Sequence, residues 1–253
     1  MARATVGLLH PGEMGAAVGG ALRERGHTVV WAASGRSDAT AARASAAGLE
    51  DVGSTAELAR RSEFILSVCP PHAALDVARS VGAFGGVFLD ANAIAPATTR
   101  AIGAGFARYV DGGIIGPPPG ASGTTRLYLS GPEAAIVAEL FDGTVVDARV
   151  LSAEIGDASA LKMVYAAWTK GTAALLLAIR EVARANGVDD ALLAEWGVSL
   201  PELPDQSLRA ATSAAAKGWR WVAEMEEIAS TFATAGQPDG FHRAAAEVFR
   251  RTN

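Results

Sequence analysis

Residues 7–31 read GLLHPGEMGAAVGGALRERGHTVVW, and the fold prediction rests on them. A short apolar run passes through the turn HPGEMG, residues 10–15, into an alanine-rich segment with helical spacing. A tight turn that leads into a helix exposes backbone N–H groups and the positive end of the helix dipole, which together bind a pyrophosphate. The stretch therefore predicts the first strand, turn and helix of a dinucleotide-binding domain.

The glycines of this turn have separate expected roles. Gly12 lets the backbone approach the phosphates, and Gly15 lets the helix pack closely on the strand. The first glycine of the usual G-x-G-x-x-G pattern is absent, and His10 stands in its place. The turn residues that we expect at the cofactor are His10, Pro11, Gly12, Glu13 and Met14.

The segment WAASGRS, residues 31–37, follows the second expected strand, where a dinucleotide site meets the adenosine ribose. An NAD site places Asp or Glu there to accept a hydrogen bond from the 2′-hydroxyl. This segment has no carboxylate but contains Ser34, Arg36 and Ser37. An arginine with hydroxyls suits a 2′-phosphate through charge-assisted hydrogen bonds. NADP is therefore the predicted cofactor.

The first half of the chain alternates between short apolar runs and helical segments. The strand-like runs are residues 5–9, 28–31, 64–68, 87–90 and 109–110, with 126–129 and 149–151 extending the series. Such alternation predicts βαβ units and a parallel sheet covered on both faces. The helical segments expected between them include 16–25, 39–47 and 73–81.

From Gly156 onward the pattern is helical only. The expected helices are 157–186, ending near Gly187, then 190–198, 205–217, 220–235 and 239–251. We therefore predict an α/β fold in two parts: a Rossmann-like dinucleotide-binding domain in residues 1–155 and an all-helical domain in residues 156–253.

Composition excludes several classes of protein. The 22 Lys and Arg against 27 Asp and Glu give a net charge of −5, which argues against nucleic-acid and anionic-membrane partners. No apolar run reaches the roughly 20 residues of a membrane-spanning helix. The four histidines lack paired spacing and there is one cysteine, so we expect no metal site. A single cysteine also fits a reducing compartment, and we expect a cytoplasmic location.

Several further motifs resemble the β-hydroxyacid dehydrogenase superfamily, which includes 3-hydroxyisobutyrate and 6-phosphogluconate dehydrogenases and the imine reductases. SVCPP (67–71) resembles the loop that packs beside the cofactor, and DANAIAP (90–96) resembles the stretch near the nicotinamide. Residues 111–132 resemble the substrate loop, and GDASALKMVYAAWTKG (156–171) resembles the start of the helix with the catalytic lysine. The chain looks closest to a short subgroup with a phosphogluconate-dehydrogenase-like C-terminal domain.

The resemblance implies roles for particular residues. Lys162 falls in the position of the catalytic lysine, and Ile115 and Gly116 fall in the substrate loop. The residues implied beside the cofactor are Cys69, Pro70, Pro71 and Asn92.

The chemistry expected of Lys162 can also be argued directly. Hydride transfer to a carbonyl or imine carbon builds negative charge on the heteroatom, which an ammonium group stabilises and protonates. Tyr165 and Thr169 follow Lys162 at helical spacings i+3 and i+7, so we expect them to contact the substrate. We predict an NADPH-dependent oxidoreductase for a small hydroxy or carbonyl substrate, bound in a cleft between the domains, with Lys162 as general acid and base.

Departures from the family pattern leave two alternatives open. The family's paired asparagines are here Tyr165 and Ala166, and its substrate-loop serine is Ile115. A later family lysine falls around Glu224 to Glu226, and carboxylates there favour an imine that becomes cationic. The alternatives are an imine reductase and a non-catalytic NADP-binding sensor or assembly protein. The apolar surface of the long helix and its tryptophans predicts a homodimer.

Overall fold

The computed structural model describes residues 3–120 and 124–252, and the chain divides into two compact units. We call them the N-terminal unit, Met1–Lys162, and the helical unit, Met163–Asn253. The division falls inside a helix, whereas the sequence pattern changes a little earlier, near residue 155.

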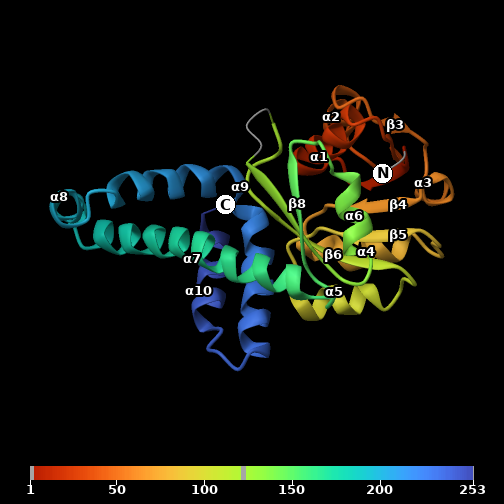
Figure 1. Cartoon of the computed structure of the whole chain (residues 1–253). Helices are drawn as coiled ribbons and strands as arrows, with labels where there is room; N and C mark the ends of the chain where they lie inside the picture. The colour runs from red at the N-terminus through yellow and green to blue at the C-terminus, as the bar shows by residue number, and fades with distance from the viewer. Residues whose placement is uncertain (1–2, 121–123, 253) are drawn as a thin grey trace. The chain divides into compact units, whose positions relative to one another are not determined.

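The described part of the N-terminal unit contains one eight-stranded sheet in the order β3-β2-β1-β4-β5-β6-β7-β8 (Figure 1). All neighbouring strands pair in parallel except β6 and β7, which are antiparallel. The strands are β1 Thr5–Leu9, β2 Thr28–Trp31, β3 Glu50–Asp51, β4 Phe64–Ser67, β5 Val87–Asp90, β6 Tyr109–Ile115, β7 Thr125–Ser130 and β8 Val146–Ser152. The predicted Rossmann-like α/β architecture is confirmed.

Helices cover both faces of this sheet. They are α1 Glu13–Glu24, α2 Asp38–Ala46, α3 Thr55–Arg61, a 3-10 turn Pro71–Ala73, α4 Ala74–Ser80, α5 Pro96–Gly103 and α6 Ala134–Leu140. One hydrophobic cluster joins the sheet to α1, α2 and α6, and a second joins it to α3, α4 and α5. Leu8 belongs to the first cluster and its neighbour Leu9 to the second, because successive strand residues point to opposite faces.

Four helices make up the rest of the described chain. They are α7 Asp157–Ala185, which begins in the N-terminal unit, then α8 Asp189–Ser199, α9 Leu203–Thr234 and α10 Gly240–Arg251. As expected, Gly187 ends α7 in a left-handed conformation with φ +70°, and its N–H donates to the carbonyl of Arg184 at 3.0 Å. The predicted break between helices 205–217 and 220–235 is wrong: α9 continues through Gly218, which is buried within the helix.

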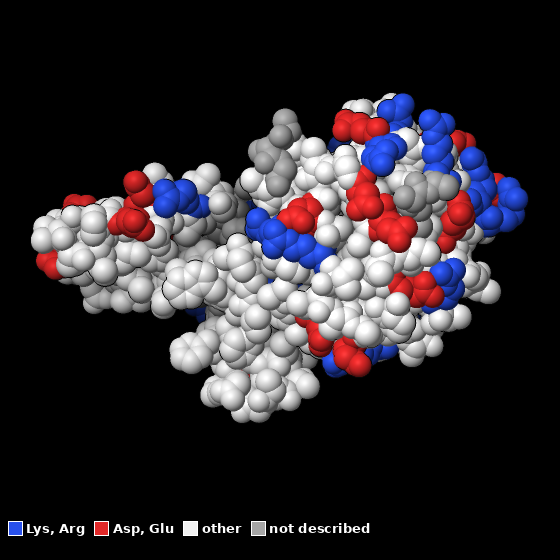
Figure 2. All heavy atoms as spheres, in the orientation of Figure 1, with Lys and Arg blue, Asp and Glu red and all other residues white. Residues whose placement is uncertain are grey.

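The charged surface differs between the two units. In Figure 2, acidic and basic side chains mix over the N-terminal unit, while much of the visible helical surface is uncharged. No helix in residues 3–120 and 124–252 is long and apolar enough to cross a membrane.

Candidate functional site

The carboxyl ends of β1, β4 and β5 meet along one edge of the sheet. Leu9 pairs with Ser67, and Ser67 with Asp90, so these three strands end level with one another. Strand β6 continues beyond this level, because Asp111 pairs with Asp90 and Ile114 lies three residues further on, roughly 10 Å past the edge. Ligands of parallel α/β sheets bind outside this edge.

The turn after β1 leads directly into α1, as in phosphate-binding turns. The N–H of Gly12 donates to the carbonyl of His10 at 2.8 Å, and α1 begins at the next residue without a side-chain cap. A Cβ built on Gly12 would meet no atom within 4 Å, whereas one on Gly15 would lie 2.6 Å from the carbonyl oxygen of His10. The close helix packing expected of Gly15 is therefore confirmed, and the space beside Gly12 is open. The other turn residues are buried Pro11, exposed Glu13 and half-buried Met14.

Two arginines flank this turn. Nη1 of Arg36 lies 3.0 Å from Nδ1 and 2.8 Å from Nε2 of His10, while Nε of Arg43 donates to the carbonyl of Pro11 at 3.4 Å. Burial, and to a lesser degree the Arg36 guanidinium, lower the pKa of His10 to about 4, so the ring is neutral at pH 7. Within the described residues neither arginine has a carboxylate partner. Arg43 was not predicted from the sequence as a cofactor residue. The signal for it was a second arginine seven residues after Arg36, behind the second strand.

The two serines of this segment differ in their surroundings. Ser37 is the N-cap of α2, and its Oγ accepts from the N–H of Thr40 at 3.3 Å. Ser34 is exposed, and its backbone N–H donates to the carbonyl of Gly53 at 3.1 Å. The hydroxyl of Ser37 is thus used by its own helix, and the contacts of both serines with a cofactor stay predictions.

Asn92 fixes the loop that follows β4. Its Oδ1 accepts from the N–H of Cys69 at 2.6 Å, and its Nδ2 donates to Oγ of Ser67 at 3.0 Å. The N–H of Asn92 in turn donates to Oδ1 of Asp90 at 2.9 Å. Asn92 is 2% exposed, so its amide positions this loop; the contact with the nicotinamide stays a prediction.

The pKa values of buried Asp90 and half-buried Cys69 are both raised, which favours their neutral forms. Burial raises the pKa of Asp90 to about 7, and Oδ2 of Asp90 has no hydrogen-bond partner among the described residues. Burial also raises the pKa of Cys69 to about 12, which excludes a thiolate at neutral pH. Pro70 follows Cys69, and Pro71 begins a 3-10 turn.

Lys162 lies in the second turn of α7, and its Nζ donates to the carbonyl of Ile114 at 2.8 Å. A Cβ on Gly113 would lie 2.7 Å from the carbonyl oxygen of Ala158 and 3.1 Å from Cβ of Lys162. Gly113 therefore allows the helix to approach β6 closely. Because Ile114 lies past the level at which β5 ends, the ammonium group is held beyond the cofactor edge of the sheet.

Asp111 fixes the start of the same helix, a role that sequence reasoning missed. Its Oδ2 accepts from the N–H of Gly156 at 3.0 Å and of Ser159 at 2.9 Å, and its Oδ1 accepts from Oγ of Ser159 at 2.6 Å. Oγ of Ser130 also donates to Oδ2 of Asp111 at 3.0 Å. A carboxylate on a strand thus does for α7 what an N-cap side chain does within a helix.

The residues expected to contact the substrate differ from one another in exposure. Ile115 is buried in β6, and Gly116 after it is exposed with φ +124°. On α7, Tyr165 is 45% exposed, while Oγ1 of Thr169 donates to the carbonyl of Ala166 at 3.4 Å. Residues 121–123 of the expected substrate loop lie outside the described residues.

Both carboxylates that favoured a cationic substrate have cationic partners. Glu224 on α9 pairs with Lys170 on α7, and both side chains are largely buried. Glu226 pairs with Arg250 of α10. These pairs weaken the argument for an iminium ion bound at Glu224 or Glu226.

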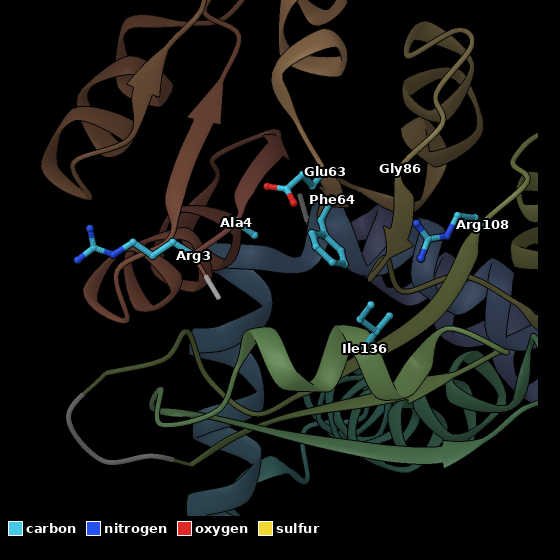
Figure 3. A pocket seen from close by; sticks show the side chains of 7 residues that line it. All are labelled: Arg3, Ala4, Glu63, Phe64, Gly86, Arg108 and Ile136. Carbon is cyan, nitrogen blue, oxygen red and sulfur yellow. The ribbon is translucent and has the colours of Figure 1, made fainter. Parts of the chain in front are cut away.

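A pocket of about 430 Å³ lies at the opposite edge of the sheet (Figure 3). Its lining residues are Arg3, Ala4, Glu63, Phe64, Gly86, Arg108 and Ile136. Most of them start or precede β1, β4, β5 and β6, so this is the amino-terminal edge, and Arg108 is already paired with Glu133. The pocket contains none of the predicted site residues. Among the described residues no group of three or more His, Cys, Asp or Glu is placed to hold a metal ion.

Comparisons with known proteins concern the family and the fold of the chain. Residues 5–91 match the family described as NADP oxidoreductase coenzyme F420-dependent, and residues 183–252 match a domain of unknown function, DUF1932. An uncharacterized 28.5 kDa protein in the 7S RNA 5′ region of Methanothermus fervidus is 31% identical over 162 residues. That alignment spans 63% of this chain and 63% of the relative.

Solved structures share the fold over nearly the whole chain. A conserved protein of unknown function, MTH1747, described as similar to 3-hydroxyacid dehydrogenases, is 26% identical with a TM-score of 0.71, over 98% of this chain and 96% of the other. A reductive aminase from Aspergillus terreus in complex with NADPH and ethyl levulinate is 19% identical with a TM-score of 0.62, over 98% and 93%. The chain therefore has the fold of the 3-hydroxyacid dehydrogenases and imine reductases, and residues 5–91 match an NADP oxidoreductase family. The predicted resemblance to the superfamily is confirmed, while the roles of the individual motif residues stay predictions.

The residues of the first turn fit NADP. The space beside Gly12 is open, as the approach of a phosphate to the backbone requires. Arg36 and Arg43 supply positive charge without a competing carboxylate among the described residues. The NADP prediction thus agrees with the family of residues 5–91 and with the NADPH of the reductive aminase.

Proposed function

We propose that this protein is an NADPH-dependent oxidoreductase that acts on a small hydroxy or carbonyl compound. The observation that supports this most is Lys162, whose ammonium group is held by Ile114 beyond the same sheet edge at which Arg36 and Arg43 flank the phosphate turn. A cation at this place suits an oxygen atom that gains negative charge.

The chain's own residues would hold the cofactor and handle the proton. The start of α1 and Gly12 bind the pyrophosphate, and Arg36 and Arg43 bind the 2′-phosphate. When bound, the nicotinamide supplies or accepts a hydride. Lys162 stabilises the charge on the substrate oxygen and donates a proton to it, and in the opposite direction its neutral amine accepts that proton.

Imine reduction is the second candidate, and the fold shared with a reductive aminase favours it. The ion pairs of Glu224 and Glu226 leave the hydroxy or carbonyl substrate as the first proposal. A panel of 3-hydroxy acids, ketones and imines, followed by NADPH absorbance, separates the two: turnover of imines alone would replace the first proposal with the second. If NADPH binds but no substrate is turned over, and binding alters the affinity for a partner protein, the protein is a sensor.

The cofactor assignment predicts a selective thermal shift. At about 100 times its Kd, NADPH should raise Tm by about 5–10 °C, and NADH at the same concentration by much less. Arg36→Ala should weaken NADPH binding about 10–100-fold and change NADH binding less than twofold, because it removes charge-assisted bonds to the 2′-phosphate. Arg79→Ala, at an exposed position on α4, is the control. Equal stabilisation of the wild type by the two cofactors would refute this assignment.

We further propose a homodimer formed through α7. Val164, Trp168, Leu175 and Val182 lie within about 40° of one another around this helix and are 52–75% exposed. Their spacing of four and seven residues is typical of helix pairs, and much of the visible surface of the helical unit is uncharged (Figure 2).

Sedimentation velocity tests this arrangement. The wild type should sediment as a dimer at micromolar concentration, and Leu175→Glu should shift it to a monomer because a charge would be buried in the interface. Val198→Glu, at an exposed apolar position of α8, should leave the dimer intact. A monomeric wild type would contradict the proposal.

We also propose a cytoplasmic location and a small-molecule substrate as the main partner. The net charge of −5 suits neither nucleic acid nor an anionic membrane surface, and the free thiol of Cys69 suits a reducing compartment. Cell fractionation that recovers the protein with membranes would contradict this.

A further inference from the structure

His10 is the one non-glycine residue among those described that has a positive φ, +64°. Residues with a Cβ are strained in this left-handed region, whereas glycine adopts it freely. The usual turn pattern has glycine at this position. A histidine is less favourable here than a glycine, because it has a Cβ. Strain of this kind persists where the side chain makes contacts that offset it.

The side chain of His10 contacts Arg36, which lies 26 residues further along the chain. Nη1 of Arg36 lies within 3.0 Å of both ring nitrogens of His10, and both side chains are partly buried. The ring is neutral at pH 7, so it accepts a hydrogen bond from the guanidinium without repelling it. The guanidinium has five N–H donors, and the ring occupies one nitrogen only, so the remaining donors are available to a ligand.

This contact restrains a side chain that is otherwise flexible. Arg36 follows Gly35, which is exposed with φ +72°, and the described residues offer the guanidinium no carboxylate that would fix it. The imidazole of His10 therefore orients the guanidinium of Arg36 beside the phosphate turn. A planar guanidinium held in one orientation loses less freedom when it binds a phosphate.

We propose that His10 is a positioning residue for cofactor selectivity: its ring holds Arg36 beside the turn so that the guanidinium binds the 2′-phosphate of NADPH. This inference rests on the proposed function and adds the residue that makes its arginine selective. Because His10 acts through Arg36, its loss should weaken the binding of NADPH and leave that of NADH nearly unchanged.

A double-mutant cycle tests this with cofactor binding as the readout. Dissociation constants for NADPH and NADH are measured by fluorescence titration for the wild type, His10→Gly, Arg36→Ala and the double variant. His10→Gly keeps the turn, because glycine accepts φ +64°, and should weaken NADPH binding about tenfold and NADH binding less than twofold. In the Arg36→Ala background, His10→Gly should change NADPH binding less than twofold.

His10→Asn provides a second variant, since asparagine tolerates the left-handed region but is too short to take the place of the ring. It should reproduce the selective loss. Equal losses for both cofactors, a loss that persists without Arg36, or NADPH binding that stays at the wild-type level would each overturn the role of His10. A wild type that binds neither cofactor would instead refute the proposed function, so the two failures are distinguishable.

Discussion

Lys162→Met should lower kcat about 10²–10⁴-fold and leave the Kd for NADPH within about twofold of the wild type. Methionine keeps the length and apolar stem of lysine but removes the ammonium group that stabilises and protonates the substrate oxygen. The hydrogen bond from Nζ to Ile114 is lost as well, yet α7 remains fixed by Asp111, so the fold should persist. Single-turnover NADPH oxidation measures the chemical step, and fluorescence titration measures cofactor binding.

Lys217→Met on α9 is the matched control, because it removes the same charge from an exposed position. It should leave both quantities near the wild-type values. If Lys162→Met retained full turnover, the proton would have another source and the proposed role would fall. If the variant lost NADPH binding instead, Lys162 would be a cofactor-binding residue.

Elements with regular apolar patterns were predictable from the sequence, and elements fixed by tertiary contacts were not. Strands β1, β2 and β5 match the expected ranges, because each consists mainly of apolar residues that pack on both faces of the sheet. Strand β3 was missed, since its two residues Glu50 and Asp51 show no apolar pattern. Its carboxylate Asp51 nevertheless accepts from the N–H groups of Ala33 and Gly53 and shapes the loop before Arg36.

One missed helix did have a local signal. Before α3, Ser54 and Glu57 form the S-x-x-E pattern of a capping box, and Oγ of Ser54 accepts from the N–H of Glu57 at 3.2 Å. The predicted break near Gly218 failed for the opposite reason. A glycine weakens an isolated helix, but here the packing around a buried position outweighs that local preference.

At the site, the sequence indicated the phosphate turn and the lysine but not what holds them. Gly12, Gly15 and Arg36 follow a pattern that depends on local chain geometry, so spacing alone could indicate them. Asn92 and Asp111 act between separate elements: Asn92 joins a residue 23 positions away, and Asp111 joins residues 12 to 48 positions away. No periodicity in a single sequence reports such pairings, although the resemblance marked the stretches in which both residues lie.

Asp111→Ala should cost about 3–5 kcal/mol of stability, the largest loss that we expect from a single substitution of a polar residue in this unit. Asp111 is 1% exposed and accepts five hydrogen bonds, from Thr99, Ser130, the N–H of Gly156, and both the N–H and the hydroxyl of Ser159. Truncation leaves these buried donors without an acceptor, and each unsatisfied group has a cost of its own. The start of α7 also loses its cap, so Lys162 loses its fixed position.

Differential scanning calorimetry should therefore show Tm lowered by about 10 °C, and kcat should fall in the fraction that remains folded. Asp147→Ala on β8 is the matched control: Asp147 pairs with Arg149 in an exposed ion pair, which is worth less than about 1 kcal/mol. Asp111→Asn separates shape from charge, because the amide fills the same space but turns an N–H₂ group toward donors. It should lose nearly as much stability as the alanine variant. If Asp111→Ala were no less stable than Asp147→Ala, the hydrogen bonds of Asp111 would not stabilise α7. The position of Lys162 would then depend on Gly113 and the packing of α7 against β6.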